Sequence, residues 1–133
     1  MKKNLTLWVV LILTAGFANA QSTTPTRLLR HIVLLTFKEG APASGIKEVD
    51  DSFRNLSVKL KQVKAYETGT VLAEGQSKTI THVYTLGFTS EQDLAGYGAS
   101  PEHQQHIKIG VSIIERGQAI DYWTTTDPAP SKH

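Results

Sequence analysis

Residues 30–38 read Arg-His-Ile-Val-Leu-Leu-Thr-Phe-Lys, and they constrain the fold of this chain more than any other segment. Their β-branched and aromatic side chains predict a β-strand. Because successive side chains of a strand point to opposite faces of the sheet, one face carries His31, Val33, Leu35 and Phe37, and the other carries Ile32, Leu34 and Thr36. Both faces are largely apolar, so both need to be covered by other parts of the structure.

Residues 45–64 have the spacing of an amphipathic helix that can cover one of these faces. The apolar residues of the segment recur every three or four positions and form one stripe: Ile46, Val49, Phe53, Leu56, Leu60 and Val63. A coiled coil is the alternative, but no partner heptads are found elsewhere in the chain. We therefore expect the stripe to pack on the sheet.

Three further segments are predicted strands: residues 65–72, 81–88 and 118–125. Gly69 in the first of them suggests a bulge or a close backbone approach. The second places His82, Tyr84, Leu86 and Phe88 on one face. With the helical segments, the order along the chain matches an α+β, ferredoxin-like fold, in which a four-stranded antiparallel sheet carries helices on one face.

The second face of the sheet, which includes Ile32 and Leu34, has no helix left to cover it. An exposed apolar face of this size indicates a partner. The simplest partner is a second copy of the chain, so we predict a homodimer in which two sheets form a dimeric α+β barrel.

Two helices are predicted before the last strand. Ser90 opens a pattern like a capping box, so the first helix should start there and run to Tyr97. Pro101 fits the first position of the second helix, where a missing N–H costs nothing. That helix should run to about Arg116, with Gly117 as its C-terminal cap.

The corner between these helices brings a phenol and an imidazole close together. Tyr97 precedes the corner, Ser100 can cap the second helix, and His103 falls in its first turn. The positive end of a helix opposes protonation of an imidazole, so a neutral His103 can act as a base at neutral pH. The alternative is an ordinary surface corner with a solvated histidine and a packed tyrosine.

These segments resemble the stress-responsive A/B barrel domain family, whose members are dimeric α+β barrels. The resemblance covers about residues 30–123 and is carried by residues 30–38, by residues 81–88 and by Tyr97-Gly-Ala-Ser-Pro-Glu-His103. The family commonly has Tyr-x-x-His-Pro-x-His at the corner, and Ser100 replaces its first histidine here. The replacement suits helix capping and removes one possible ligand.

The resemblance implies an acid–base site that needs no cofactor. A plant enzyme of the family, olivetolic acid cyclase, closes a polyketide by aldol condensation, and its corner tyrosine and histidine match Tyr97 and His103. Two of its pocket histidines match His31 and His82. We therefore predict the catalytic residues His103 and Tyr97 and the substrate-binding residues His31, His82, Phe37, Tyr84 and Phe53.

The predicted ligand is a small, apolar or carbonyl-bearing compound, and the predicted chemistry is that of a lyase or cyclase. One alternative is a stress or ligand-binding dimer without catalysis. A further alternative is a metal or haem protein using His103 and His106, although this pair lacks acidic or thiolate companions. No cofactor is predicted.

The N-terminus has the three parts of a secretory signal peptide. Lys2 and Lys3 are followed by an apolar run too short to span a membrane comfortably, and then by Ala18-Asn19-Ala20. We divide the chain into a signal peptide (1–20), a flexible leader (21–29), the domain (30–125) and a tail (126–133). The expected location is periplasmic or secreted, without stable membrane insertion after cleavage.

Removal of the signal peptide also changes the charge. The chain has 14 Lys and Arg residues and 12 Asp and Glu residues, and two of the lysines belong to the signal peptide. The mature chain is then balanced, so its sequence gives no support to a nucleic-acid partner. The chain has no cysteine, which excludes disulfides and thiolate chemistry.

We predict that export removes residues 1–20, because the cleavage pattern ends at Ala20. Intact-mass measurement of the exported protein should give a chain beginning at Gln21. A mass that retains the apolar segment would contradict cleavage.

Overall fold

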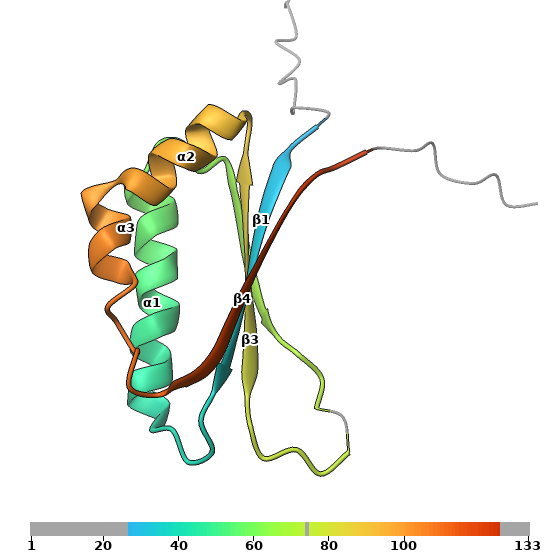
Figure 1. The fold of residues 1–133 in the computed structure, drawn as a ribbon, viewed down its shortest axis with the longest axis vertical. Helices are drawn as coiled ribbons and strands as arrows, with labels where there is room; N and C mark the ends of the chain where they lie inside the picture. The colour runs from blue at the N-terminus through green and yellow to red at the C-terminus, as the bar shows by residue number, and fades with distance from the viewer. Residues whose placement is uncertain (1–26, 74, 126–133) are drawn as a thin grey trace, which may run out of the picture.

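The computed structural model describes residues 27–73 and 75–125 of the chain. The predicted signal peptide, residues 21–26 of the predicted leader and the predicted tail lie outside these ranges. Figure 1 shows a single sheet with all of the labelled helices on one side of it.

Seven elements make up the described part of the chain. In order they are β1 (Leu29–Phe37), α1 (Ala43–Lys59), β2 (Ala65–Thr70), β3 (Thr81–Phe88), α2 (Glu91–Ala99), α3 (Pro101–His106) and β4 (Ile114–Trp123). The strands lie in the order β2-β3-β1-β4, and each neighbouring pair is antiparallel. The predicted ferredoxin-like fold is confirmed. Among the described strands, β2 and β4 are the edges of the sheet and do not pair with each other, so these four strands do not close a barrel.

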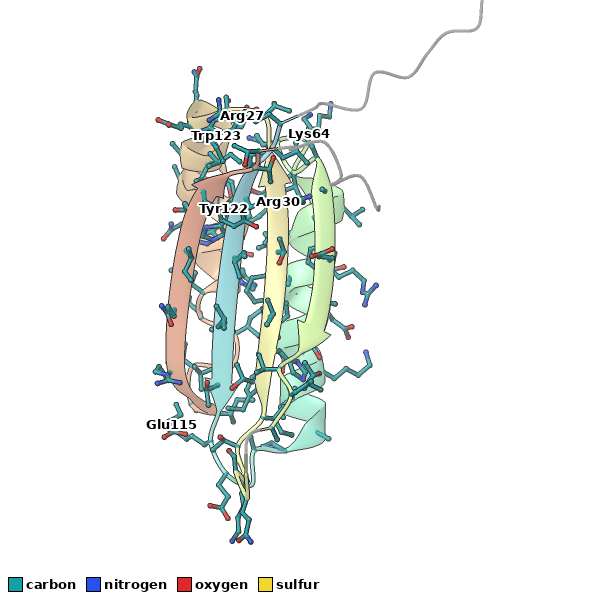
Figure 2. All side chains as sticks on the ribbon, turned by 90° about the vertical axis from the view of Figure 1, so that its right-hand side faces the viewer. Arg27, Arg30, Lys64, Glu115, Tyr122 and Trp123 are labelled. Atoms are coloured by element: carbon teal, nitrogen blue, oxygen red, sulfur yellow. The ribbon has the colours of Figure 1, made fainter. Side chains whose placement is uncertain are left out.

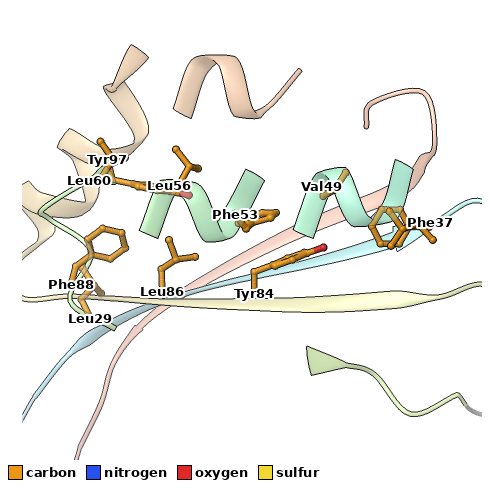
Figure 3. Close-up of a cluster of buried hydrophobic side chains, with 11 residues drawn as sticks. Leu29, Phe37, Val49, Phe53, Leu56, Leu60, Tyr84, Leu86, Phe88 and Tyr97 are labelled. Atoms are coloured by element: carbon orange, nitrogen blue, oxygen red, sulfur yellow. The ribbon is translucent and has the colours of Figure 1, made fainter. Parts of the chain in front are cut away.

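The predicted apolar stripe of α1 forms the centre of the core. Figure 3 shows it above the sheet, and the buried residues include Ile46, Val49, Phe53, Leu56, Leu60, Tyr84, Leu86 and Phe88. The rings of Phe53 and Tyr84 are stacked, with centroids 3.8 Å apart and planes 11° apart. Burial of each large apolar side chain contributes about 1.5–3 kcal/mol, so this layer supplies much of the driving force for folding.

The other face of the sheet carries none of the helices of residues 27–73 and 75–125, and Figure 2 views the molecule from that side. Cross-strand pairing places Ile32 beside Ile120 of β4, and Leu34 beside Val83 of β3. Ile120 is 45% exposed and Tyr122 is 46% exposed. Within residues 27–73 and 75–125, none of the helices has the length and apolar character that a membrane crossing requires.

The prediction that the last helix runs to Arg116 is wrong. α3 ends at His106, and β4 already begins at Ile114, so Gly117 lies in a strand and caps no helix. The intervening Ile107-Lys-Ile-Gly-Val-Ser-Ile113 contains several β-branched residues, which form helices poorly. Gly110 adopts a left-handed conformation with φ +74° and turns the chain toward the sheet.

Two smaller predictions were also wrong. α1 ends at Lys59 rather than near Lys64, because the Lys64 amide donates to the Gly87 carbonyl oxygen and the chain enters the sheet. Gly69 is no bulge, since it pairs with Val83 in regular register, and a Cβ added at Gly69 would meet no atom within 4 Å.

Replacing Gly110 by alanine should destabilise the fold. A Cβ atom there would lie 2.3 Å from Cγ2 of Val49, in addition to the cost of the left-handed backbone. We expect a loss of about 2–4 kcal/mol in the free energy of unfolding, measured by urea denaturation.

Gly40→Ala is the matched control, because Gly40 has φ +75° and a Cβ added there would have no atom within 4 Å. Its loss should be about 1–2 kcal/mol, the backbone contribution alone. Equal losses in the two variants would show that contact with Val49 contributes nothing.

Candidate functional site

The corner between α2 and α3 is built around the side chain of Ser100. Its hydroxyl donates to the Tyr97 carbonyl oxygen at 2.7 Å and accepts from the His103 amide at 3.2 Å. Ser100 therefore caps α3 as predicted, with Pro101 at the start of the helix. The same hydroxyl links the backbones of the two residues predicted to be catalytic.

Three aromatic rings meet beneath this corner. The Tyr97 and His103 ring centroids are 4.8 Å apart, and those of His31 and Tyr97 are 5.9 Å apart. The hydroxyl of Tyr97 and Nδ1 of His103 are both buried, and neither has a hydrogen-bond partner among the described residues. A buried polar atom without any partner costs about 1–3 kcal/mol, so these two atoms are suited to donate a hydrogen bond to a ligand or a water molecule, or to accept one from it.

The protonation states of these rings follow from their surroundings. Burial raises the pKa of Tyr97, so its hydroxyl keeps its proton and can donate it in a hydrogen bond. Burial lowers the pKa of His103, an effect opposed by the Gly98 carbonyl oxygen and supported by the positive charge that His31 can carry. The main cause of the lowered pKa is thus desolvation. A neutral imidazole at neutral pH is able to accept a proton.

An apolar cavity of about 370 Å³ lies next to these rings, between the sheet and the helices. Its wall contains the side chains of His31, Val33, Leu35, Val49, Phe53, His103, His106, Ile107, Ile109, Ile114 and Ala119. Among these described residues, the three histidines are the only ionisable side chains. Small-molecule sites commonly combine an apolar wall with a few polar groups in this way.

The predicted site residues fall into two groups. His31, His103 and Phe53 line the cavity, and Tyr97 packs against both histidines without forming part of the wall. His82, Phe37 and Tyr84 are not in the wall. His82 pairs with Leu35, whereas His31 pairs with Leu86, so the two histidines are separated along the strands.

His82 and Tyr84 instead share one carboxylate of α1. Nδ1 of His82 donates to Oδ1 of Asp50 at 2.8 Å, and the Tyr84 hydroxyl donates to the same oxygen at 2.6 Å. Burial raises the pKa of Tyr84, and the bond to Asp50 adds to that effect. Phe37 packs edge-on against His82, with ring centroids 5.4 Å apart. In this arrangement the three residues hold α1 on the sheet.

Two features of the site were missed in the sequence. Nδ1 of His31 donates to Oδ1 of Asp121 at 2.6 Å, which leaves Nε2 as the nitrogen that can accept a proton. Only the pairing of β1 with β4 places Asp121 opposite His31. His106 also lines the cavity, and its Nδ1 shares a 2.7 Å hydrogen bond with Oγ of Ser52.

His103 and His106, the pair considered for a metal ion, are not joined by further metal-binding side chains among the described residues. The rings of His103 and His106 have centroids 5.9 Å apart. Within the described ranges, 27–73 and 75–125, no group of three or more His, Asp or Glu side chains is placed to hold a metal ion.

Two comparisons of the sequence with known proteins point to the same domain family. Residues 29–124 match the model of the stress responsive A/B barrel domain. The stress-response A/B barrel domain-containing protein HS1 of Arabidopsis thaliana is 28% identical over 99 residues, which are 74% of this chain and 91% of HS1.

Two solved structures illustrate the range of similar folds. Hydroxynitrile lyase from Passiflora edulis is 25% identical in sequence and superposes with a TM-score of 0.66. The match covers 78% of this chain and 100% of the lyase. A dimeric ferredoxin-like protein of unknown function from Thermobifida fusca is 17% identical with a TM-score of 0.61, covering 74% and 92% of the two chains. At that identity the second comparison supports the fold alone.

We predict that His106 makes the protein less stable in acid. Burial and the neighbouring His103 lower the pKa of His106 from 6.5 to about 4. The unfolded chain therefore binds more protons than the folded one between these two values, so the free energy of unfolding falls as the pH falls through this window. The free energy of unfolding should fall by about 1–3 kcal/mol, which is less than the full effect expected from the difference between the two pKa values.

Urea denaturation above and within this pH window measures the effect. His106→Gln keeps a hydrogen-bonding group near Ser52 but cannot titrate, so it should lose less stability in acid than the wild type. His103 contributes with the same sign in both proteins, because burial lowers its pKa too. An identical loss in wild type and variant would show that His106 is not the responsible group.

Proposed function

Because the chain belongs to the stress-responsive A/B barrel domain family, we propose that its cavity binds a small, partly apolar, carbonyl-bearing compound and catalyses cofactor-free acid–base chemistry on it. The supporting observation is the pair of buried, unpartnered polar atoms beside the cavity, the Tyr97 hydroxyl and Nδ1 of His103. A ligand oxygen that reached these two atoms would give each of them a partner.

The proposed chemistry is proton transfer coupled to a carbon–carbon bond. In the lyase direction, neutral His103 takes the hydroxyl proton of a hydroxynitrile, the C–O bond becomes a carbonyl, and the bond to the nitrile carbon breaks. Cyanide leaves with the electron pair and receives the proton from His103. In a cyclase direction, the same imidazole takes a proton next to a ketone, and the Tyr97 hydroxyl donates to the enolate oxygen.

His31 and Tyr97 have supporting roles in this proposal. The bond from His31 to Asp121 fixes the ring so that its Nε2 can accept from a ligand hydroxyl. Tyr97 is not part of the cavity wall, so the proposal includes a turn of the His103 ring that opens a path from the cavity to the tyrosine hydroxyl.

A ligand-binding protein without catalysis is the second candidate. The same position of Tyr97 behind the cavity wall favours it, because no donor other than the histidines then reaches a bound ligand directly from the described residues of the wall. Ligand binding without catalysis requires the cavity but does not require the Tyr97 hydroxyl.

The proposal also includes a homodimer formed through the open face of the sheet. Ile120 and Tyr122 are each close to half exposed on that face, where Ile32 and Leu34 also lie. Figure 2 shows that none of the described helices covers this face. A second copy would bury it and convert two open sheets into one barrel. Export to the periplasm or the medium, expected from residues 1–20, completes the proposal.

The catalytic test uses mandelonitrile and acetophenone as probes. Calorimetry should detect acetophenone binding, and the protein should release benzaldehyde from mandelonitrile above the spontaneous rate. His103→Ala and Tyr97→Phe should each lower kcat roughly a hundredfold or more, while acetophenone still binds.

Tyr66→Phe is the comparison variant: it removes another buried tyrosine hydroxyl, near Tyr97, from a residue that is not in the cavity wall. It should leave the rate unchanged. Binding without turnover would select the non-catalytic candidate, and failure to bind either probe would refute the proposal as a whole.

The dimer test replaces Leu34 by glutamate on the open face. A buried unpaired carboxylate should weaken association by several kcal/mol, so sedimentation at micromolar concentration should change from dimer to monomer. Val58→Glu, at a 79% exposed position of α1, should sediment like the wild type. A monomeric wild-type protein would contradict the proposed assembly.

A further inference from the structure

The apolar cavity and a second hollow on the protein share two residues of their walls. The second hollow is a groove of about 440 Å³ between α1 and α3. His106 and Ile109 line both the groove and the cavity. The partition between the two spaces therefore includes these two side chains.

The groove differs from the cavity in its chemistry. Lys47, Asp51, Asn55 and Gln105 are among its lining residues, and Lys47 and Asp51 form an ion pair. The cavity has only histidines among otherwise apolar residues. A ligand that reached from one space into the other would have an apolar part in the cavity and a polar or solvated end in the groove.

His106 is held in this partition by contacts that a ring rotation can release. Its Nδ1 bonds to Oγ of Ser52 at 2.7 Å, and its ring packs edge-on against Phe53 with centroids 4.2 Å apart. The backbone on either side is fixed more firmly, by the Ser100 cap before it and by the tight turn at Gly110 after it. A movement of the side chain alone would therefore leave α3 in place.

We propose that His106 determines the length of ligand that the cavity accepts. With its ring in place, an apolar carbonyl compound is confined to the cavity. With the ring turned aside or removed, the cavity opens into the groove and longer chains fit. This inference rests on the proposed function, because it takes the cavity to hold the apolar part of a small carbonyl compound.

Straight-chain methyl ketones of increasing length provide the test, with dissociation constants measured by calorimetry. In the wild type, affinity should rise about fourfold for each added methylene until the cavity is full, and then stop rising. In His106→Ala, the rise should continue to longer ketones, while the shortest ketones bind much as they do to the wild type.

Ile109→Ala truncates the other residue that lines both the groove and the cavity. It should also increase the ketone length at which affinity stops rising. Ser52→Ala releases the His106 ring without changing the core, and it keeps the test valid where a larger truncation fails to fold. The ketone length at which affinity stops rising should lie between the values for the wild type and for His106→Ala. Val58→Ala, on the exposed face of α1, is the control with an unchanged limit.

The outcomes separate the two proposals. A length limit that is the same in the wild type and all three partition variants would overturn the role of His106 and leave the proposed function standing. Absence of binding by every ketone, including the shortest, would contradict the proposed function and this inference with it.

Discussion

The stacked contact of Phe53 with Tyr84 is the interaction on which both the fold and the cavity depend. It fixes α1 over β3, and Asp50, three residues before Phe53, strengthens the attachment by accepting hydrogen bonds from Tyr84 and His82. The same phenyl ring forms part of the cavity wall and packs against His106. The core and the candidate site are therefore not independent, since one side chain belongs to both.

Residue periodicity predicted much of this arrangement. The alternation in residues 30–38 and 81–88 identified β1 and β3 and the residues on each face, and the spacing from Ile46 to Leu60 identified the buried side of α1. These features are predictable because a packed core requires apolar side chains at the repeat of the helix or strand. The Ser100 cap was also visible, because it depends only on neighbouring residues.

The features that were missed depend on contacts between distant segments. Alternation places His31 and His82 on one face, but it does not specify their positions along that face, and they lie apart. The partnership of Asp121 with His31 requires the register of β4 against β1. The apolar residues after His106 suit a helix or a strand, so their pattern does not show where the helix ends; in the structure residues 107–113 form a turn, and strand pairing begins with Ile114 opposite Phe37.

The two hydrogen bonds of the Ser100 hydroxyl have a consequence for how the corner meets a ligand. They join the Tyr97 carbonyl oxygen to the His103 amide, so the two backbones move as one unit. The conformational entropy of bringing a phenol and an imidazole together is then lost when the chain folds, and not when a molecule enters the cavity. The backbone of the corner is in this sense preorganised, so binding free energy is needed only for the turn of the His103 ring.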